Sequence, residues 1–137
     1  MTRVFADTFF FLALLNRRDP AHEEALRFYG DATLHFVTTE WVLSEVANAS
    51  SAPAMRPGFK RLFDLLGRDT RVQIVPAGHD AFRRGLELYF SRLDKEWSFT
   101  DCTSFGIMDQ ESIEDALTGD HHFEQAGFRA VLGPRKS

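Results

Sequence analysis

Strand-like and helix-like segments alternate along almost the whole chain, and this alternation limits its fold more than any other feature. Short apolar runs are typical of buried strands, and apolar residues three or four positions apart are typical of helices. The first pattern predicts strands at residues 3–6, 35–37, 71–75, 115–117 and 128–132. The second predicts helices at residues 8–15, 21–29, 40–49, 59–67, 80–93, 102–111 and 122–126. This order predicts an α/β fold with a parallel sheet covered on both faces.

Length and composition are those of one ordinary globular domain, which we expect to span residues 1–137. The 137 residues are 44% hydrophobic and 26% charged, and the 14 phenylalanines predict a core rich in aromatic packing. Cys102 is the single cysteine, so no internal disulfide can form, which fits a reducing cytoplasm. We expect no signal peptide, because Asp7 interrupts the apolar run at residues 4–15, which is too short to cross a bilayer.

Four acidic residues occupy positions that suggest a common site. Asp7 directly follows the first predicted strand, and Asp120 follows a late one. Ligands of parallel sheets bind beyond the carboxyl ends of the strands, so both side chains should lie at that edge. Asp101 begins the predicted helix that leads into the same late strand, and Glu45 lies close to the inward stripe of the third predicted helix. The four acids can therefore converge.

Each acid also has a purely structural interpretation. An aspartate at a helix start commonly accepts hydrogen bonds from free backbone N–H groups, which would explain Asp7, Asp101 and Asp120 as helix caps. Glu45 could be an exposed flank residue or one partner of an internal salt bridge, because an unpaired acid on an inward stripe is costly. Taken one at a time, these interpretations compete with any catalytic role.

Taken together, the four acids predict a divalent metal site. Carboxylates gathered in a crevice raise each other's pKa unless a cation neutralises them. Ligand sets made only of oxygen favour Mg²⁺ or Mn²⁺ over zinc. The net charge of −4 does not oppose a nucleic-acid substrate, because the remaining chain has 16 basic and 16 acidic residues once these four acids are set aside.

Other reactive residues are weaker candidates. Asp109 lies eight residues beyond Asp101 on one predicted helix, roughly 12 Å along its axis and too far for one metal centre. His121 and His122 are adjacent, so they should not both reach one ion from a regular helix, and we interpret them as surface residues. Cys102 is interpreted as a small buried residue. No phosphate-cradling glycine loop is present.

Four motifs resemble a known family in their order and spacing. VFADTFFFLALLN, TTEWVLSEV, SFTDCTSF and ALTGDHHFEQAGF are similar to the conserved blocks of PIN-domain ribonucleases, particularly single-domain toxins of the VapC type. The resemblance spans almost the whole chain. It implies a three-layer α/β/α sandwich around a central parallel sheet.

The resemblance also implies roles for the acids. Asp7, Glu45, Asp101 and Asp120 would be the catalytic quartet around one or two Mg²⁺ ions, with Mn²⁺ as an alternative. Asp7 and Asp101 would be the most direct ligands, Asp120 would complete the site, and Glu45 would hold a second ion or orient the attacking water. Hydroxyl groups of nearby threonines would order these carboxylates, namely those of Thr8, Thr100 and Thr118.

The partners implied by the resemblance are an RNA substrate, a second copy of the chain and a cognate antitoxin protein. Toxins of this family are inhibited by a small antitoxin that commonly inserts a helix and a basic side chain near the acids. Basic residues that could contact RNA, although ordinary solvated helix faces explain most of them, are Arg17, Arg18, Arg56, Lys60, Arg61, Arg83, Arg84, Arg92 and Lys95.

Two other function classes compete with this one. A phosphatase of the haloacid dehalogenase type needs a second aspartate two residues after the first, and that position holds Phe9. A non-catalytic PIN-fold module that binds RNA or protein would have little reason to keep four mutually repelling acids. The residues therefore favour a metal-dependent endoribonuclease, with the binding module as the alternative.

Overall fold

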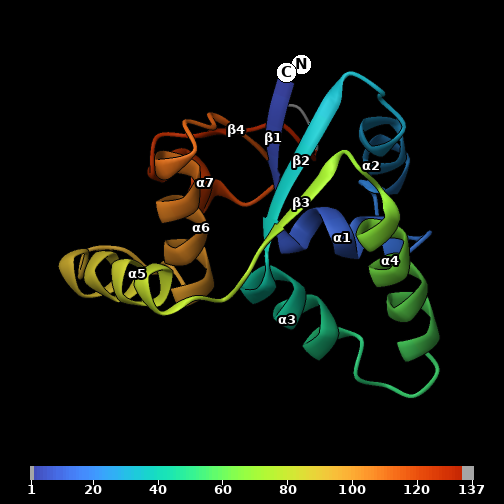
Figure 1. Cartoon of the computed structure of the whole chain (residues 1–137), viewed down its shortest axis with the longest axis horizontal. Coiled ribbons are helices and arrows are strands. Elements are labelled where there is room, and N and C mark those ends of the chain that lie inside the picture. Colours follow the sequence, from blue (N-terminus) through green and yellow to red (C-terminus); the bar gives the residue numbers. More distant parts are fainter. Residues whose placement is uncertain (1, 134–137) are drawn as a thin grey trace.

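Five strands form one fully parallel sheet in the computed structural model, which describes residues 2–133 (Figure 1). The strands lie side by side in the order β3-β2-β1-β4-β5, so β1 is central and β5 is an edge strand, as predicted. The sheet confirms the predicted α/β fold. The strands are β1 (Thr2–Ala6), β2 (Leu34–Thr39), β3 (Val72–Val75), β4 (Asp115–Leu117) and β5 (Arg129–Ala130).

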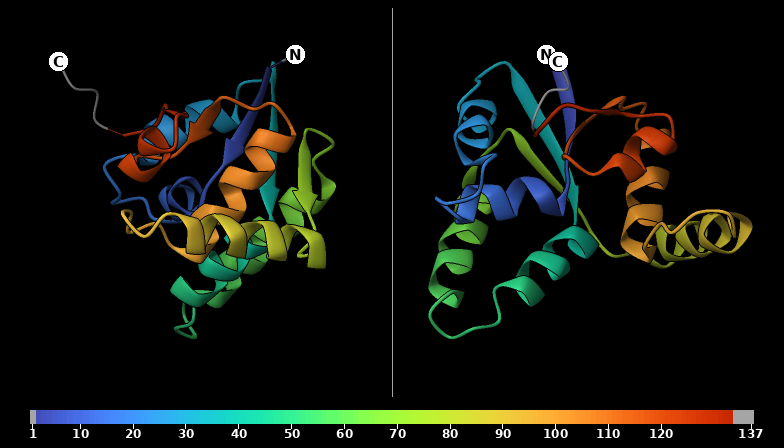
Figure 2. Two further views of the ribbon diagram at one scale, coloured as in Figure 1. Left: turned by 90° about the vertical axis from the view of Figure 1, so that its left-hand side faces the viewer. Right: turned by 180° about the vertical axis from the view of Figure 1, so that it is seen from behind.

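Helices cover both faces of this sheet and complete the three-layer sandwich. Figures 1 and 2 show α1, α2 and α4 on one side and α6 on the other, with α5 packed outside α6. Helix α3 contacts both α1 and α6, so it bridges the two helical layers. The helices are α1 (Thr8–Leu15), α2 (His22–Tyr29), α3 (Glu40–Ala49), α4 (Arg56–Arg68), α5 (His79–Ser91), α6 (Phe99–Gln110) and α7 (His121–Gln125).

The strand order places a crevice beside β1. The chain runs from β1 outward through β2 to β3, and then returns to the other side of β1 with β4 and β5. Such a reversal leaves an opening at the carboxyl ends of the two strands that flank it, here β1 and β4. Asp7 and Thr118 are the residues that directly follow these two strands.

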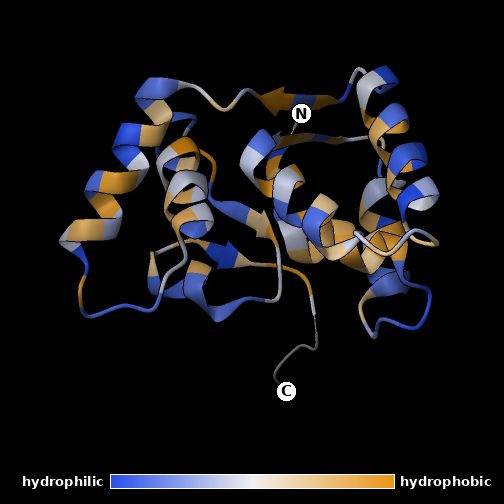
Figure 3. Cartoon of the chain, turned by 90° about the horizontal axis from the view of Figure 1, so that it is seen from below, coloured by the Kyte–Doolittle hydropathy of each residue, from blue (hydrophilic) through white to orange (hydrophobic). Residues whose placement is uncertain are grey.

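Phenylalanine rings fill much of the core, as the composition predicted. The ring of Phe123 contacts two others, with centroid distances of 6.4 Å to Phe5 and 4.9 Å to Phe105. On the opposite face, Phe10 lies between Phe11 and Phe36. Hydrophilic and hydrophobic residues are interleaved along the outer helices in Figure 3, which is the pattern of helices that bury one side only.

The predicted element bounds are accurate for α1, α3 and β4 and wrong at the starts of α4 and α6. Helix α4 begins at Arg56 rather than at residue 59, because Pro57 fits within a first helical turn, where its missing N–H costs nothing. Helix α6 begins at Phe99 rather than at residue 102. Asp101 therefore lies inside the first turn of α6 and not at its start.

The contact between α5 and α6 depends on a missing side chain at Gly85. A Cβ atom at this position would lie 2.8 Å from Cγ2 of Thr103 and 3.2 Å from Cε1 of Phe99. We expect Gly85→Ala to lower the free energy of unfolding by about 1–2 kcal/mol, because the strain of overpacking exceeds the gain in helix propensity. Gly106→Ala is the control. Among residues 2–133, no atom beyond its chain neighbours and its own helix backbone lies within 4 Å of the added Cβ, so urea denaturation should show unchanged or higher stability.

No helix among residues 2–133 combines the length and the apolar character that a membrane span requires.

Candidate metal centre

The four predicted acids line a single cavity of about 350 Å³ at the carboxyl ends of β1 and β4. They come from four separate places in the fold: Asp7 follows β1, Glu45 lies in α3, Asp101 lies in α6 and Asp120 caps α7. Residues distant in the sequence therefore meet at the crevice that the strand order creates. The other residues that line the cavity are Thr8, Phe9, Leu12, Glu96, Ser98 and His122.

Asp7 is buried and does not act as a helix cap. Its backbone is extended and it precedes α1, but its side chain makes no capping hydrogen bond. Instead, the hydroxyl group of Thr118 donates to Oδ2 of Asp7 over 2.9 Å. The same Thr118 oxygen accepts a hydrogen bond from the backbone N–H of Asp120. The cap interpretation of Asp7 is thus wrong, and Thr118 connects two of the four acids.

Asp101 takes part in a capping box at the start of α6. The backbone N–H of Ser98 donates to Oδ2 of Asp101, and the backbone N–H of Asp101 donates to Oγ of Ser98. These reciprocal bonds hold the carboxylate at the N-terminus of the helix. Asp101 therefore has a structural role as well as a place in the cavity.

Glu45 is neither exposed nor paired with a base in the described part of the chain. It is half-buried in α3, and its Oε1 accepts a 2.6 Å hydrogen bond from the hydroxyl group of Thr8. Thr8 and Thr118 thus order carboxylates as the family resemblance implied. Thr100 does not: no hydrogen bond from its hydroxyl group to a carboxylate is found among residues 2–133. Its backbone carbonyl accepts a hydrogen bond from the hydroxyl group of Thr103.

His122 belongs to the cavity, contrary to the prediction that it is a surface residue. Its Nδ1 lies 3.0 Å from Oδ2 of Asp101 and 3.4 Å from Oδ1 of Asp120, and 20% of its side chain is exposed. His121 behaves as predicted, with 72% of its side chain exposed. The backbone N–H of His122 donates to Oδ1 of Asp120, which caps the five-residue α7. The adjacent pair of histidines was a weak signal in the sequence, because only the tertiary structure shows which ring turns inward.

Burial and mutual repulsion make ionisation of the cavity acids costly. Burial raises the pKa of Asp7 from 3.8 to about 7, with further increases from the charges of Asp101 and Glu45, although the Thr118 hydroxyl opposes the shift. Burial also raises the pKa of Asp101, against its hydrogen bonds from Ser98 and His122. A cation in the cavity would remove this cost.

The donor groups present fit a divalent ion. Hydrogen bonds fix one oxygen of each carboxylate, namely Oδ2 of Asp7, Oε1 of Glu45, Oδ2 of Asp101 and Oδ1 of Asp120. None of the lysine and arginine ion pairs between residues 2 and 133 involves these four acids. Prearranged carboxylates that no lysine or arginine of this part of the chain neutralises are the ligands that hard divalent ions prefer.

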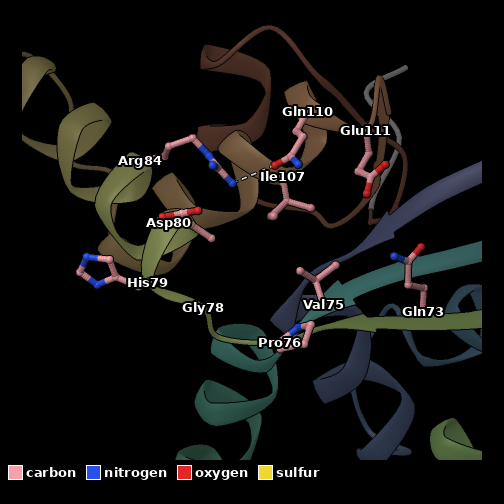
Figure 4. A pocket seen from close by; sticks show the side chains of 11 residues that line it. Gln73, Val75, Pro76, Gly78, His79, Asp80, Arg84, Ile107, Gln110 and Glu111 are labelled. Atoms are coloured by element: carbon pink, nitrogen blue, oxygen red, sulfur yellow. Dashed lines mark hydrogen bonds between the residues drawn. The ribbon is translucent and has the colours of Figure 1, made fainter.

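Another hollow, of about 390 Å³, lies between the end of β3, α5 and α6 (Figure 4). Its arginine is already engaged, because Nη2 of Arg84 donates to Oε1 of Gln110 over 2.8 Å. The hollow contains Asp80 and Glu111 but none of the four predicted acids. The cavity between β1 and β4 is therefore the better candidate for a catalytic centre.

Replacing Thr118 with valine tests how far this hydroxyl group supports the cavity. Thr118 is fully buried, and valine has nearly its shape but can neither donate to Asp7 nor accept from the backbone of Asp120. We expect the free energy of unfolding to fall by about 1–3 kcal/mol in urea denaturation, because two buried polar groups lose their partner. Thr118→Ser keeps the hydroxyl group and should recover most of this loss. Equal losses in both variants would show that the methyl group matters instead.

Comparison with known proteins finds similarity along nearly the whole chain. The family model of the PIN domain matches residues 4–129. The chain is 30% identical over 138 residues to "23S rRNA-specific endonuclease VapC20" from two strains of Mycobacterium tuberculosis, covering 93% of this chain and 97% of each relative. The crystal structure of Mycobacterium tuberculosis VapC20, described as a sarcin-ricin loop cleaving toxin, superposes with a TM-score of 0.82 and 27% identity. The superposition covers 95% of this chain and 99% of the VapC20 chain.

Proposed function

Because the chain belongs to the PIN-domain family, we propose that it is a metal-dependent endoribonuclease of the VapC toxin type whose catalytic centre is the cavity lined by Asp7, Glu45, Asp101 and Asp120. The observation that carries the proposal is the meeting of these four acids, from four separate elements, in one cavity. The predicted family, α/β/α fold and RNA-cleaving class agree with the matching family model and with the VapC20 relatives.

In this proposal each acid has a distinct role. Asp7, Asp101 and Asp120 hold a divalent ion, Mg²⁺ by preference for oxygen ligands and Mn²⁺ as an alternative. Glu45 holds a second ion or orients the attacking water, for which its hydrogen bond from Thr8 sets its position. When bound, such an ion lowers the pKa of the attacking water and stabilises the negative charge that develops on the phosphate.

The RNA target we propose is the large ribosomal RNA. The similarity to VapC20 covers nearly the full length of both chains, so the surfaces that surround the cavity have counterparts in that enzyme. Contacts to phosphates would come from the basic residues named above. Some already have partners, because Lys60 pairs with Asp64, and Arg92 and Lys95 pair with Asp94. Arg84 and Arg56 donate hydrogen bonds to Gln110 and Ser51. The first to test are therefore Arg17, Arg18, Arg61 and Arg83, by the salt dependence of RNA binding.

The protein partners we propose are a cognate antitoxin and a second copy of the chain. The family resemblance implies both partners, and exposed apolar side chains on the structure could contact them. Phe82, Phe90 and Leu93 are 42%, 64% and 89% exposed on α5 and just after it. Contiguous exposed apolar side chains commonly mark protein contacts.

Cleavage of purified ribosomes and of a mixed RNA pool tests the proposed function. We expect Mg²⁺ or Mn²⁺ to support site-specific cutting of the large ribosomal RNA, mapped by primer extension, and EDTA to abolish it. Cutting of the mixed pool alone would retain the nuclease and exclude the proposed target. Folded protein that binds RNA but cuts neither substrate with any divalent ion would favour the non-catalytic binding module.

A further inference from the structure

One nitrogen atom lies among the oxygens of the carboxylate cavity. Nδ1 of His122 is 3.0 Å from Oδ2 of Asp101 and 3.4 Å from Oδ1 of Asp120. One ligand atom each from Asp120, His121 and His122 also fit within 4.8 Å of one another. An imidazole nitrogen therefore lies beside the oxygens expected from the acids alone.

The distances from Nδ1 of His122 to the carboxylate oxygens of Asp101 and Asp120 are those of neighbouring ligands around one ion. Bonds of about 2.1 Å at right angles in an octahedral site place adjacent ligand atoms about 3 Å apart. We propose that His122 is a further ligand of the divalent ion, through Nδ1, and that it shifts the selectivity of the site from Mg²⁺ toward transition ions. This inference rests on the proposed function, since it concerns the same metal centre.

The position of His122 is well determined by its surroundings. Its backbone N–H is bonded to the cap residue Asp120, and the next residue, Phe123, is fully buried against Phe5 and Phe105. The histidine ring also contacts that of His121, with centroids 4.6 Å apart. A side chain that is held in place before the ion arrives loses little freedom on binding it.

Imidazole changes which ions the site prefers. Mg²⁺ favours oxygen and keeps its waters, whereas imidazole binds transition ions well, with affinity rising from Mn²⁺ to Co²⁺ and Ni²⁺. Three carboxylates and one imidazole should therefore bind Co²⁺ more tightly, relative to Mg²⁺, than the three carboxylates alone. A histidine that only donates a hydrogen bond to Asp101 would not produce this preference.

His122→Asn separates the two possibilities. The asparagine amide can still donate a hydrogen bond to Asp101 from about the position of Nδ1, but it has no lone pair on nitrogen for a metal. His121→Asn is the matched control, because His121 is the neighbouring imidazole and is mostly exposed. Thermal melting in EDTA establishes that each variant is folded.

Pulsed electron paramagnetic resonance of the Mn²⁺-loaded protein is the direct readout. We expect nitrogen coupling in the wild type and in His121→Asn and none in His122→Asn. Calorimetry should show at least about a tenfold loss of Co²⁺ affinity in His122→Asn, with Mg²⁺ affinity nearly unchanged. Wild-type protein that binds Mn²⁺ without nitrogen coupling would overturn this inference alone. Wild-type protein that binds no divalent ion would overturn the proposed metal centre together with it.

Discussion

Replacing Asp101 with asparagine is expected to lower the rate of RNA cleavage by at least about a thousandfold while the protein stays folded. The expected loss corresponds to roughly 4 kcal/mol of transition-state stabilisation, the range in which loss of a metal's charge stabilisation falls. Asparagine is nearly isosteric, and its side-chain oxygen can still accept the hydrogen bond that the backbone of Ser98 donates. The variant therefore removes the charge and preserves the helix cap. Single-turnover cleavage of a fluorescent RNA measures the effect.

Ser98→Ala is the control for the structural role of Asp101. It removes the hydroxyl oxygen that caps the backbone of Asp101 but leaves the carboxylate. We expect a loss of about 1 kcal/mol in stability and less than tenfold in rate. If Asp101→Asn instead unfolds, or if it cuts RNA at nearly the wild-type rate, Asp101 acts as a helix cap and not as part of a catalytic centre.

Replacing Asp7 with asparagine is expected to abolish cleavage and, at the same time, to stabilise the metal-free protein at alkaline pH. The pKa of Asp7 is raised to about 7 by burial, whereas in the unfolded chain the group ionises near 3.8. The stability associated with protonated Asp7 is therefore fully present below about pH 4 and is lost as the pH rises through about 7. Asparagine cannot ionise, so the variant does not lose it.

The expected gain is about 2–4 kcal/mol at pH 8 and close to zero at pH 4, because one pKa unit corresponds to about 1.4 kcal/mol. Urea denaturation in EDTA at several pH values measures it. Saturating Mn²⁺ should reverse the order, because only the wild type then gains binding energy. Asp109→Asn, on the exposed side of α6, should show neither effect. A variant that is less stable than the wild type at every pH would show that Asp7 is mainly structural.

Local patterns were sufficient to predict the parallel sheet and most of the elements. The apolar run of α1 and the cap residue Thr39 before α3 were enough to predict the bounds of both helices correctly. These signals lie within a few positions of the residues that they concern. The predicted start of α6 is wrong because its cap pairs Ser98 with an aspartate, where glutamate or glutamine is the usual partner. The prediction therefore placed Asp101 as the cap before the helix and not in its first turn.

The candidate site was only partly predictable, because its parts come from distant positions. Topology was enough to bring Asp7 and Asp120 to one edge of the sheet, since both follow strands that flank the crevice. The inward turn of His122 toward Asp101, 21 positions away, depends on how the short α7 packs against the core. Nothing in the local sequence distinguishes it from His121.

A crystal structure of the protein with Mn²⁺ would show whether the cavity is the metal centre, because the anomalous signal of manganese locates each ion. We expect a peak inside the cavity, from an ion bonded at about 2.2 Å to carboxylate oxygens of Asp7 and Asp101. Asparagine at position 101 should remove it. Manganese bound only elsewhere on the surface, with the four carboxylates protonated or turned apart, would contradict the assignment of this cavity as the metal centre.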